Sequence, residues 1–504
     1  MGFLVKREYL KPRAELLEEA AARVGPSASY YALTMGGDPV GYISATTDTL
    51  ADTIKVQSNW VLAIQALGSL QQVGVITVIN LSRSMRLRSF DAMVNSPSSR
   101  FTMRGQAVGD SLLDMTIDAG GRPQHLQTRL SRSLVLSDMV NMRLAVGGQL
   151  RTGHTYTMRV FDPITQRDGQ SELSVLGEST VVYVDSAVFD SARSRWVPAH
   201  RDTVRAFHIS QTYAGSTAES WIDERGNILT ASTSLGISLQ RTAFEIAVEN
   251  WRHDKDSGRV AGVGAGSDVI SNTAIASNAV LEPANLRQLR VRLGSVDLSG
   301  FDLAGGRQQV AGDTLTVTRE SADLERDHGG LTMYDAALPL VGLDSAIDAA
   351  TRPEPLIQSD DPRIVAQARA ITRGERRAGR VAALLTHWVH DNLEKKITIS
   401  VPSAVQVLAD RSGDCNEHTV LYVALARAAG LPARTASGVV YLRGHFYYHA
   451  WPEVWLGRWV AVDPTFGQVP ADASHLRFVI GGLARQVELV RLIGRLQLEV
   501  VATQ

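Results

Sequence analysis

Residues 412–434 read SGDCNEHTVLYVALARAAGLPAR, and this stretch decides the fold of the C-terminal part of the chain. Its small and aliphatic side chains recur at helical spacing at Leu421, Ala424, Leu425 and Ala428. The pattern predicts a helix from Cys415 to Ala429 with one buried face. Gly430 suits the position after a helix end, and Pro432 prevents the helix from continuing.

The single cysteine of the 504-residue chain, Cys415, falls in the first turn of this predicted helix, where Asp414 is a natural N-cap. Free N–H groups and the positive end of the helix dipole stabilise a thiolate, which is the nucleophilic form of cysteine. A lone cysteine more often serves as a small buried apolar residue, so its position alone assigns no role. One cysteine also excludes an intramolecular disulfide and any site with several thiolate ligands.

Two predicted strands downstream carry a histidine and an aspartate. His449 lies within Phe446–Leu456, and Asp463 follows Arg458–Val462 after a tight turn, so adjacent strands would bring the two side chains together. A thiol needs a base within about 3 Å, and that base needs a third group to fix its tautomer. Each residue alone could be an ordinary core or strand-end residue, but together with Cys415 they indicate a catalytic triad.

Three segments resemble the signature of the transglutaminase-like superfamily: residues 412–434, residues 449–454 (HAWPEV) and residues 459–465 (WVAVDPT). The resemblance covers roughly residues 356–480. It implies a papain-related α+β fold without a cofactor. By position it makes Cys415 the nucleophile, His449 the general base and acid, and Asp463 the orienting carboxylate.

The resemblance implies a thiol-dependent acyl-transfer enzyme, a cysteine peptidase or amidase, with a peptide or protein as substrate. A transglutaminase-type amine acyltransferase and a non-catalytic binding protein on the same fold are the alternatives. Arylamine acetyltransferases share the order of the triad, but residues 411–414 depart from the Arg-Gly-Gly-led approach to their cysteine. The backbone N–H of Cys415 would be one oxyanion donor, and Trp388 or Gln406 could supply another.

The preceding residues favour mainly antiparallel β-structure, because short runs alternate between apolar and polar side chains. Examples are residues 54–56, 75–79 and 155–161 and a hairpin at 221–229. A helical pattern begins at Asp361-Pro362 and predicts two helices before Cys415. The expected domains are a helical arm (1–28), an antiparallel β domain (29–253), a linker (254–276), a small β module (277–355), the catalytic domain (356–480) and a C-terminal tail (481–504). The tail holds an alternating run at 496–500 that is expected to pair with an earlier strand.

Charge and composition set limits on partners and location. Lys and Arg total 51 against 52 Asp and Glu, and no basic run is interleaved with aromatic residues, which argues against nucleic acid. His387, His390, His418 and His445 lack the pattern of a metal site, so no metal is expected. The start of the chain has three consecutive apolar residues and predicts neither a signal peptide nor a membrane span. Resemblance to multidomain bacterial envelope proteins implies an extracytoplasmic or membrane-anchored location, and the oligomeric state stays open.

Overall fold

The computed structural model describes residues 24–504 except for short gaps at 51, 67–68, 98, 110–111, 122, 130–134, 137–138, 163–166, 214–215, 234–235, 257–269, 271–272, 322–332 and 399. Residues 1–23 of the expected helical arm and most of the expected linker therefore lie outside the described residues. The chain forms two compact units. The N-terminal unit comprises Met1–Asp118 and Pro123–Asp268, and the C-terminal unit comprises Ala119–Arg122 and Val269–Gln504.

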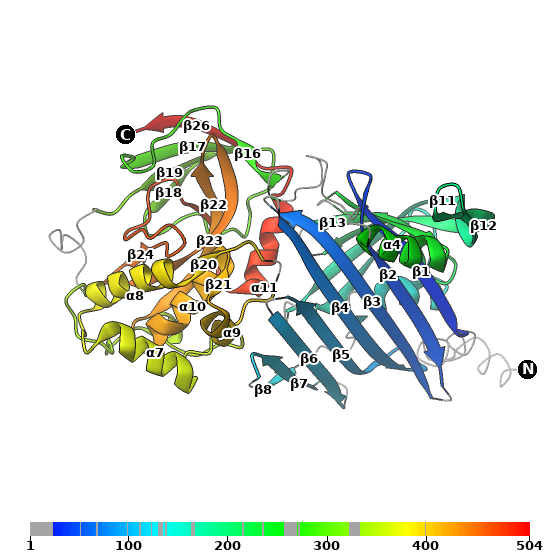
Figure 1. Cartoon of the computed structure of the whole chain (residues 1–504), viewed down its shortest axis with the longest axis horizontal. Coiled ribbons are helices and arrows are strands. Elements are labelled where there is room, and N and C mark those ends of the chain that lie inside the picture. Colours follow the sequence, from blue (N-terminus) through cyan, green and yellow to red (C-terminus); the bar gives the residue numbers. More distant parts are fainter. Residues whose placement is uncertain are drawn as a thin grey trace, which may run out of the picture. The chain divides into compact units, whose positions relative to one another are not determined.

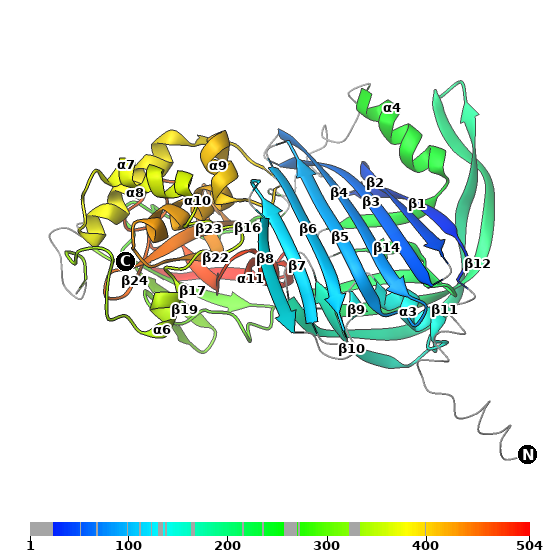
Figure 2. The same ribbon diagram turned by 90° about the horizontal axis from the view of Figure 1, so that it is seen from below.

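The N-terminal unit is built on one 15-stranded sheet in the order β8-β7-β6-β5-β4-β3-β2-β1-β15-β14-β13-β12-β11-β10-β9 (Figures 1 and 2). Its strands are β1 (Ser27–Met35), β2 (Asp38–Thr49), β3 (Thr53–Ala66), β4 (Ser69–Ser82), β5 (Leu87–Ser96), β6 (Ser99–Val108), β7 (Leu112–Ala119), β8 (Pro123–Arg129), β9 (Val135–Leu136), β10 (Thr155–Asp162), β11 (Arg167–Asp190), β12 (Arg195–Tyr213), β13 (Ser216–Asp223), β14 (Ile228–Ser232) and β15 (Ile237–Thr242). Helix α3 (Val140–Val146), the π-helix η2 (Glu245–Glu249) and α4 (Asn250–Asp256) complete it. The antiparallel β-structure expected from the alternating runs is confirmed.

Alternation explains why these segments form strands with one buried face. In β7 the side chains of Leu113, Met115 and Ile117 are buried while their neighbours are more exposed. The expected hairpin at 221–229 is the β13–β14 turn, where Gly226 has φ +84°. Asp223 closes this turn by accepting hydrogen bonds from the backbone N–H groups of Arg225 and Asn227.

The helices of the C-terminal unit are α6 (Ser345–Ala349), α7 (Pro362–Thr372), α8 (Ala378–Asn392), α9 (Ala404–Asp410), α10 (Cys415–Ala428), α11 (Leu483–Gln486) and the 3-10 helix η3 (Val487–Arg491). Asp361 caps α7 as its sequence predicts, since its carboxylate accepts from the N–H of Arg363. The expectation of two helices before Cys415 is too low, because α6 and α9 add to α7 and α8. Both are single short segments of five and seven residues, too short for the periodicity of their apolar side chains to stand out. No helix in the described ranges combines the length and apolarity that a bilayer span requires.

The described residues of the C-terminal unit form three sheets. The strands are β16 (Ile275–Ala276), β17 (Gln288–Gly294), β18 (Gln308–Ala311), β19 (Thr314–Thr318), β20 (Glu394–Lys395), β21 (Ser412–Gly413), β22 (Ala433–Leu442), β23 (His445–Trp455), β24 (Trp459–Ala461), β25 (Leu476–Ile480) and β26 (Gln497–Thr503). The central sheet runs β16-β23-β22-β25 with β24 on β23, the second runs β18-β19-β17-β26, and β20 pairs with β21. The unit thus has the α+β composition expected of it.

The expected boundaries separate a β module at 277–355 from a tail at 481–504, whereas the structure joins parts of both. Strand β26 of the tail pairs with β17 of the module. Strand β17 is therefore the earlier strand with which the alternating run at 496–500 was expected to pair. Apolar side chains of this sheet also pack in one cluster with Phe446 of β23 and Phe478 of β25. The expected linker likewise borders regular structure, since its first residues belong to α4 and its last two form β16.

Helix α10 lies at the centre of the C-terminal unit. It packs against α7, α8 and α9 and against strands β22 and β23 (Figure 1). Every residue from Glu417 to Arg427 is buried, so the helix is covered on all sides rather than along one stripe. Tyr422 illustrates the packing, because its buried hydroxyl donates a 3.1 Å hydrogen bond to the carbonyl of Ala382 in α8. This burial fixes the position of the helix and of Cys415 at its start.

A close backbone approach joins β22 to β25. A Cβ atom at Gly438 would lie 1.9 Å from the carbonyl oxygen of Leu476, where the register of the two strands shifts. We expect Gly438→Ala to lower the free energy of unfolding by about 2 kcal/mol or more, because the strands must separate to admit the methyl group. Chemical denaturation measures this change.

Gly482→Ala is the matched control, because its Cβ would meet its nearest neighbour at an ordinary 3.6 Å. Equal stability of the two variants would contradict the described pairing of β22 with β25.

Candidate active site

Cys415 is held at the start of α10 by the segment that precedes it. Helix α9 ends at Asp410, and its C-cap residue Arg411 has a left-handed backbone conformation; Ser412–Gly413 then pairs with Glu394–Lys395. Gly413 has φ +155°, and a Cβ atom there would lie 2.3 Å from the side chain of Glu417. Only glycine fits this position, which explains the Gly-Asp-Cys order of the sequence.

Asp414 and Glu417 form a capping box around the first turn of α10. The Asp414 carboxylate accepts a 2.8 Å hydrogen bond from the N–H of Asn416, and the N–H of Asp414 donates at 3.0 Å to Glu417. Ser400 donates to the other oxygen of Glu417. The helix start is therefore fixed, and one of its free N–H groups already binds a carboxylate.

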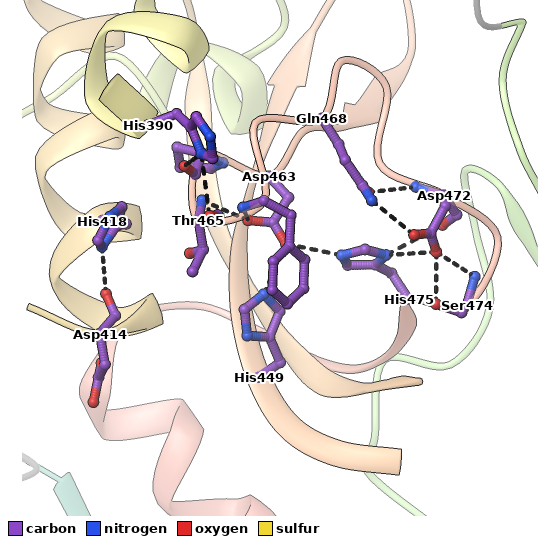
Figure 3. Close-up of polar contacts among 12 residues, drawn as sticks. His390, Asp414, His418, His449, Asp463, Thr465, Gln468, Asp472, Ser474 and His475 are labelled. Atoms are coloured by element: carbon purple, nitrogen blue, oxygen red, sulfur yellow. Dashed lines mark hydrogen bonds and ion pairs between the residues drawn. The ribbon is translucent and has the colours of Figure 1, made fainter. Parts of the chain in front are cut away.

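His449 and Asp463 meet as their strands predict. His449 Nε2 lies 2.7 Å from Asp463 Oδ2, and both side chains are buried (Figure 3). The second oxygen of Asp463 accepts hydrogen bonds from the backbone N–H groups of Thr465 at 2.7 Å and Phe466 at 3.2 Å. The carboxylate is thus held on both oxygens. Its pKa lies far below the usual range, because the two histidines beside it, His449 and His475, outweigh the effect of burial.

Cys415 is half-buried beside the same strand. No hydrogen bond joins its thiol to the His449 ring among the described residues, but the backbone N–H of Ala450, the next residue along β23, acts on the thiol as a hydrogen-bond donor. The strand that carries His449 therefore also borders the thiol. Proton transfer between Cys415 and His449 would require them to approach to hydrogen-bond distance.

The charge environment of Cys415 differs from the expected one. Burial, followed by the charges of Asp414 and Glu417, raises the pKa of the thiol well above its usual range, although the N–H of Ala450 acts the other way. Two carboxyl groups therefore lie at the helix start, and both act against ionisation of the thiol. A base that takes the thiol proton would offset this effect.

A second histidine, His475, touches the same carboxylate and was not identified from the sequence. His475 Nε2 lies 2.9 Å from Asp463 Oδ2, and Nδ1 lies 3.1 Å from Asp472 Oδ1 (Figure 3). His475 directly precedes β25, which pairs with β22 in the central sheet. Its signal in the sequence is the mostly polar segment Asp472-Ala473-Ser474-His475 directly before the mainly apolar run at 476–480, which marks the start of a further strand.

Aromatic rings enclose the His449 side chain. The ring of Phe466 stacks on it at 5.0 Å between centroids, and Trp451 lies at 6.1 Å. His390 of α8 fixes the segment that carries Phe466, since its Nδ1 lies 3.2 Å from the carbonyl oxygens of both Pro464 and Thr465. The imidazole therefore has little freedom to rotate.

Trp388 and Gln406 are the oxyanion donors that the sequence suggests, and His418 is one of the histidines weighed as metal ligands. The Arg411 guanidinium lies over the ring of Trp388 at 4.5 Å, and Gln406 lies on α9. His418 is buried with Nδ1 at 2.7 Å from the carbonyl of Asp414, and burial lowers its pKa.

Among the described residues, one group of side chains has the spacing of a metal site. The ligand atoms of His449, Asp463 and His475 lie within 4.8 Å of one another. Both ring nitrogens, however, lie at hydrogen-bond distance from a single carboxylate oxygen, and the far nitrogen of His475 faces Asp472. This is the arrangement of a protonated hydrogen-bond network, whereas a metal would require both nitrogens as unprotonated donors. The donor set therefore fits a metal poorly.

Comparison with known proteins identifies the domain that contains this site. Residues 365–464 match the family model of the transglutaminase-like superfamily. No curated protein matches the chain.

Several solved structures resemble the chain at low identity. A candidate cysteine protease from Cytophaga hutchinsonii is 16% identical, covers 43% of this chain and 86% of its own, and gives a TM-score of 0.27. A DUF1089-family protein from Pseudomonas aeruginosa is 12% identical over 41% of this chain and 89% of its own, with a TM-score of 0.21. A candidate protease from Parabacteroides distasonis is 9% identical over 72% of this chain and 63% of its own, with a TM-score of 0.19. These scores are low, so the assignment of the domain rests on the family model.

The electrostatic effect of Asp414 on Cys415 is testable. Asp414→Asn keeps an oxygen that caps α10 but removes the carboxyl group beside the thiol, whose own pKa burial and the neighbouring Glu417 raise. The pKa of the thiol should fall, because a nearby negative charge disfavours the thiolate. The midpoint of the pH profile of iodoacetamide alkylation should therefore move at least about half a pH unit lower. Asp410→Asn at the end of α9 is the control, and an unchanged or higher midpoint in Asp414→Asn would contradict the description.

Proposed function

Because residues 365–464 form a transglutaminase-like domain, we propose that the chain is a thiol-dependent acyl-transfer enzyme acting on peptide-like amide bonds, as a cysteine peptidase or amidase. The observation that carries the proposal is the buried 2.7 Å hydrogen bond between His449 and Asp463, on the strand that borders the thiol of Cys415. Buried titratable groups with strongly shifted pKa values, gathered beside a nucleophile, are typical of catalytic sites.

The hydrogen bonds support a role for each nitrogen of His449. Asp463 is ionised and only accepts, so Nε2 carries the proton that it shares with Asp463 Oδ2. In the neutral ring, Nδ1 is then the basic nitrogen. It is the atom that would take the proton of Cys415.

The proposed reaction proceeds through a thioester. His449 Nδ1 removes the thiol proton as the sulfur attacks the substrate carbonyl, and the backbone N–H of Cys415 donates to the oxyanion. The imidazolium then gives its proton to the leaving amine as the C–N bond breaks, which leaves an acyl group on Cys415. Water, deprotonated by His449, attacks the thioester and releases the acid and the free thiol.

The raised pKa of Cys415 is consistent with this sequence of proton transfers. A thiol that stays protonated at rest depends on its base for every turnover, whereas a preformed thiolate does not. We therefore assign His449 to the attack as well as to the departure of the leaving group.

Substitutions in the triad should reduce activity in a graded order. Cys415→Ala should abolish turnover, because the chain has no other thiol. His449→Ala should lower kcat/KM by about 10²- to 10⁴-fold, the usual contribution of a positioned general base. Asp463→Asn should fall toward the larger losses in this range, because the N–H groups of Thr465 and Phe466 hold the amide oxygen and turn the NH2 group toward His449 Nε2, which then has no acceptor. Steady-state kinetics on fluorogenic peptide amides measures these losses, with circular dichroism to verify folding.

Turnover near the wild-type level in folded Cys415→Ala would refute the proposed mechanism. Unchanged activity in Asp463→Asn would remove that residue from the mechanism and leave the Cys415–His449 pair.

The fate of the acyl group separates hydrolysis from transfer. Both reactions share the thioester and differ in whether water or an amine attacks it. We expect the free acid to remain the main product when a primary amine is added at millimolar concentration, and mass spectrometry of the products measures the ratio. A dominant amide product would assign the chain to the transglutaminase-type amine acyltransferases instead.

A further inference from the structure

His475 is buried between two carboxylates. Its Nε2 lies 2.9 Å from Asp463 Oδ2, and its Nδ1 lies 3.1 Å from Asp472 Oδ1. The ring has no exposed surface, and neither carboxylate side chain is more than 4% exposed. Both nitrogens are thus committed to anionic acceptors in a place from which water is excluded.

This geometry requires both ring nitrogens to carry a proton. A neutral imidazole has one nitrogen with a lone pair, and that lone pair would face a carboxylate oxygen at about 3 Å, which is repulsive. The imidazolium has two N–H donors and satisfies both acceptors. Burial alone lowers the pKa of His475, but Asp472 and Asp463 outweigh it and raise the pKa to about 9.

Asp472 is itself fixed as an acceptor. Its Oδ1 accepts from the N–H of Ser474 at 2.8 Å and from the Ser474 hydroxyl at 2.6 Å, and its Oδ2 accepts from Gln468 Nε2 at 2.9 Å. Gln468 in turn exchanges backbone hydrogen bonds with Asp463 at 2.8 and 2.9 Å. Residues 463–475 therefore close into one hydrogen-bonded loop that returns to Asp463 through His475.

The charge of His475 acts on the same oxygen that His449 uses. Asp463 Oδ2 receives both Nε2 atoms, and the two imidazole rings lie 5.8 Å apart. The His475 cation and the His449 ring thus share one carboxylate oxygen, so the Asp463 charge is already partly compensated by His475.

Other groups around His475 do not replace this charge. The rings of Trp451 and Phe466 pack against it and are uncharged. The guanidinium of Arg307 binds the carbonyls of Ala471 and Asp472 at 2.9 Å and is paired with Glu320 at 3.4 Å.

We propose that His475 is a positioning residue of the site: a permanently protonated imidazolium, held by Asp472, that fixes the Asp463 carboxylate and makes the Cys415–His449 pair harder to protonate. The proposal rests on the proposed roles of Cys415 and His449. Its effect on pH dependence has a defined sign. Adding a proton to the uncharged pair gives a net positive charge, whichever of the two residues holds the proton, so a neighbouring cation lowers the pH at which this occurs.

The first test measures the charge of His475 directly. In the ¹⁵N-labelled protein, both ring nitrogens of His475 should have the chemical shifts of protonated nitrogens throughout pH 6–8, with the signals assigned by their loss in His475→Gln. A neutral ring at pH 7 would overturn the proposal, whether or not Cys415 is catalytic.

The second test measures its effect on the pair through the pH profile of Cys415 alkylation by iodoacetamide. His475→Gln removes the positive charge and leaves the charge of Asp472 uncompensated, so the midpoint should move about one pH unit higher. Asp472→Asn removes a negative charge together with the proton that it holds on Nδ1, so its midpoint should move in the same direction by less. His445→Gln is the matched control, because His445 is exposed on the same strand β23, and its midpoint should equal that of the wild type.

The outcomes separate the two proposals. A lower alkylation rate at every pH with an unchanged midpoint, in either variant that folds, would reduce His475 to a structural residue and overturn this inference. A wild-type Cys415 that reacts only after denaturation would instead overturn the proposed function. The NMR measurement would still decide the charge of His475.

Discussion

The Asp463 carboxylate accepts hydrogen bonds from two backbone N–H groups and from two imidazole rings, at a position with no exposed surface. A buried carboxylate is stable only when its charge is compensated, and these four donors compensate it. The arrangement requires β23, the segment after β24 and the start of β25 to meet at one point. The chain that follows Asp463 is therefore organised around this group, through Gln468, Asp472 and His475.

The position of the Cys415 thiol is set by a different part of the C-terminal unit, helix α10 and the residues that precede it. Burial of α10 between the helices and the central sheet sets the position of its first residue, and Gly413 and Asp414 set the direction in which the chain enters. Burial, and after it the same capping carboxylate, raise the pKa of Cys415. Asp414 therefore stabilises the start of α10 but disfavours ionisation of the Cys415 thiol. In the proposed mechanism, His449 offsets this effect by taking the thiol proton.

Sequence alone predicted those parts of the structure that depend on local pattern. Asp361 and Asp414 identified the starts of α7 and α10, and alternation identified the strands that carry His449 and lead to Asp463. The sequence did not show which strand pairs with β26. Strand β17 lies some 200 residues earlier, and many other alternating runs could pair with β26 equally well. His475 was missed for a related reason, since its link to Asp463 depends on a loop closed by side-chain hydrogen bonds. The raised pKa of Cys415 depends on burial, which the helix pattern did not reveal.

The central claim is that Cys415 carries the acyl group during turnover. The most direct measurement is to mix the protein with a reactive peptide ester, quench with acid within milliseconds to seconds, and locate the acyl group by mass spectrometry of the digested chain. The account predicts a thioester on the peptide that contains Cys415, which forms faster than steady-state turnover and accumulates further in Asp463→Asn if deacylation is slowed. Turnover without an adduct on Cys415, or an adduct on another residue, would contradict it.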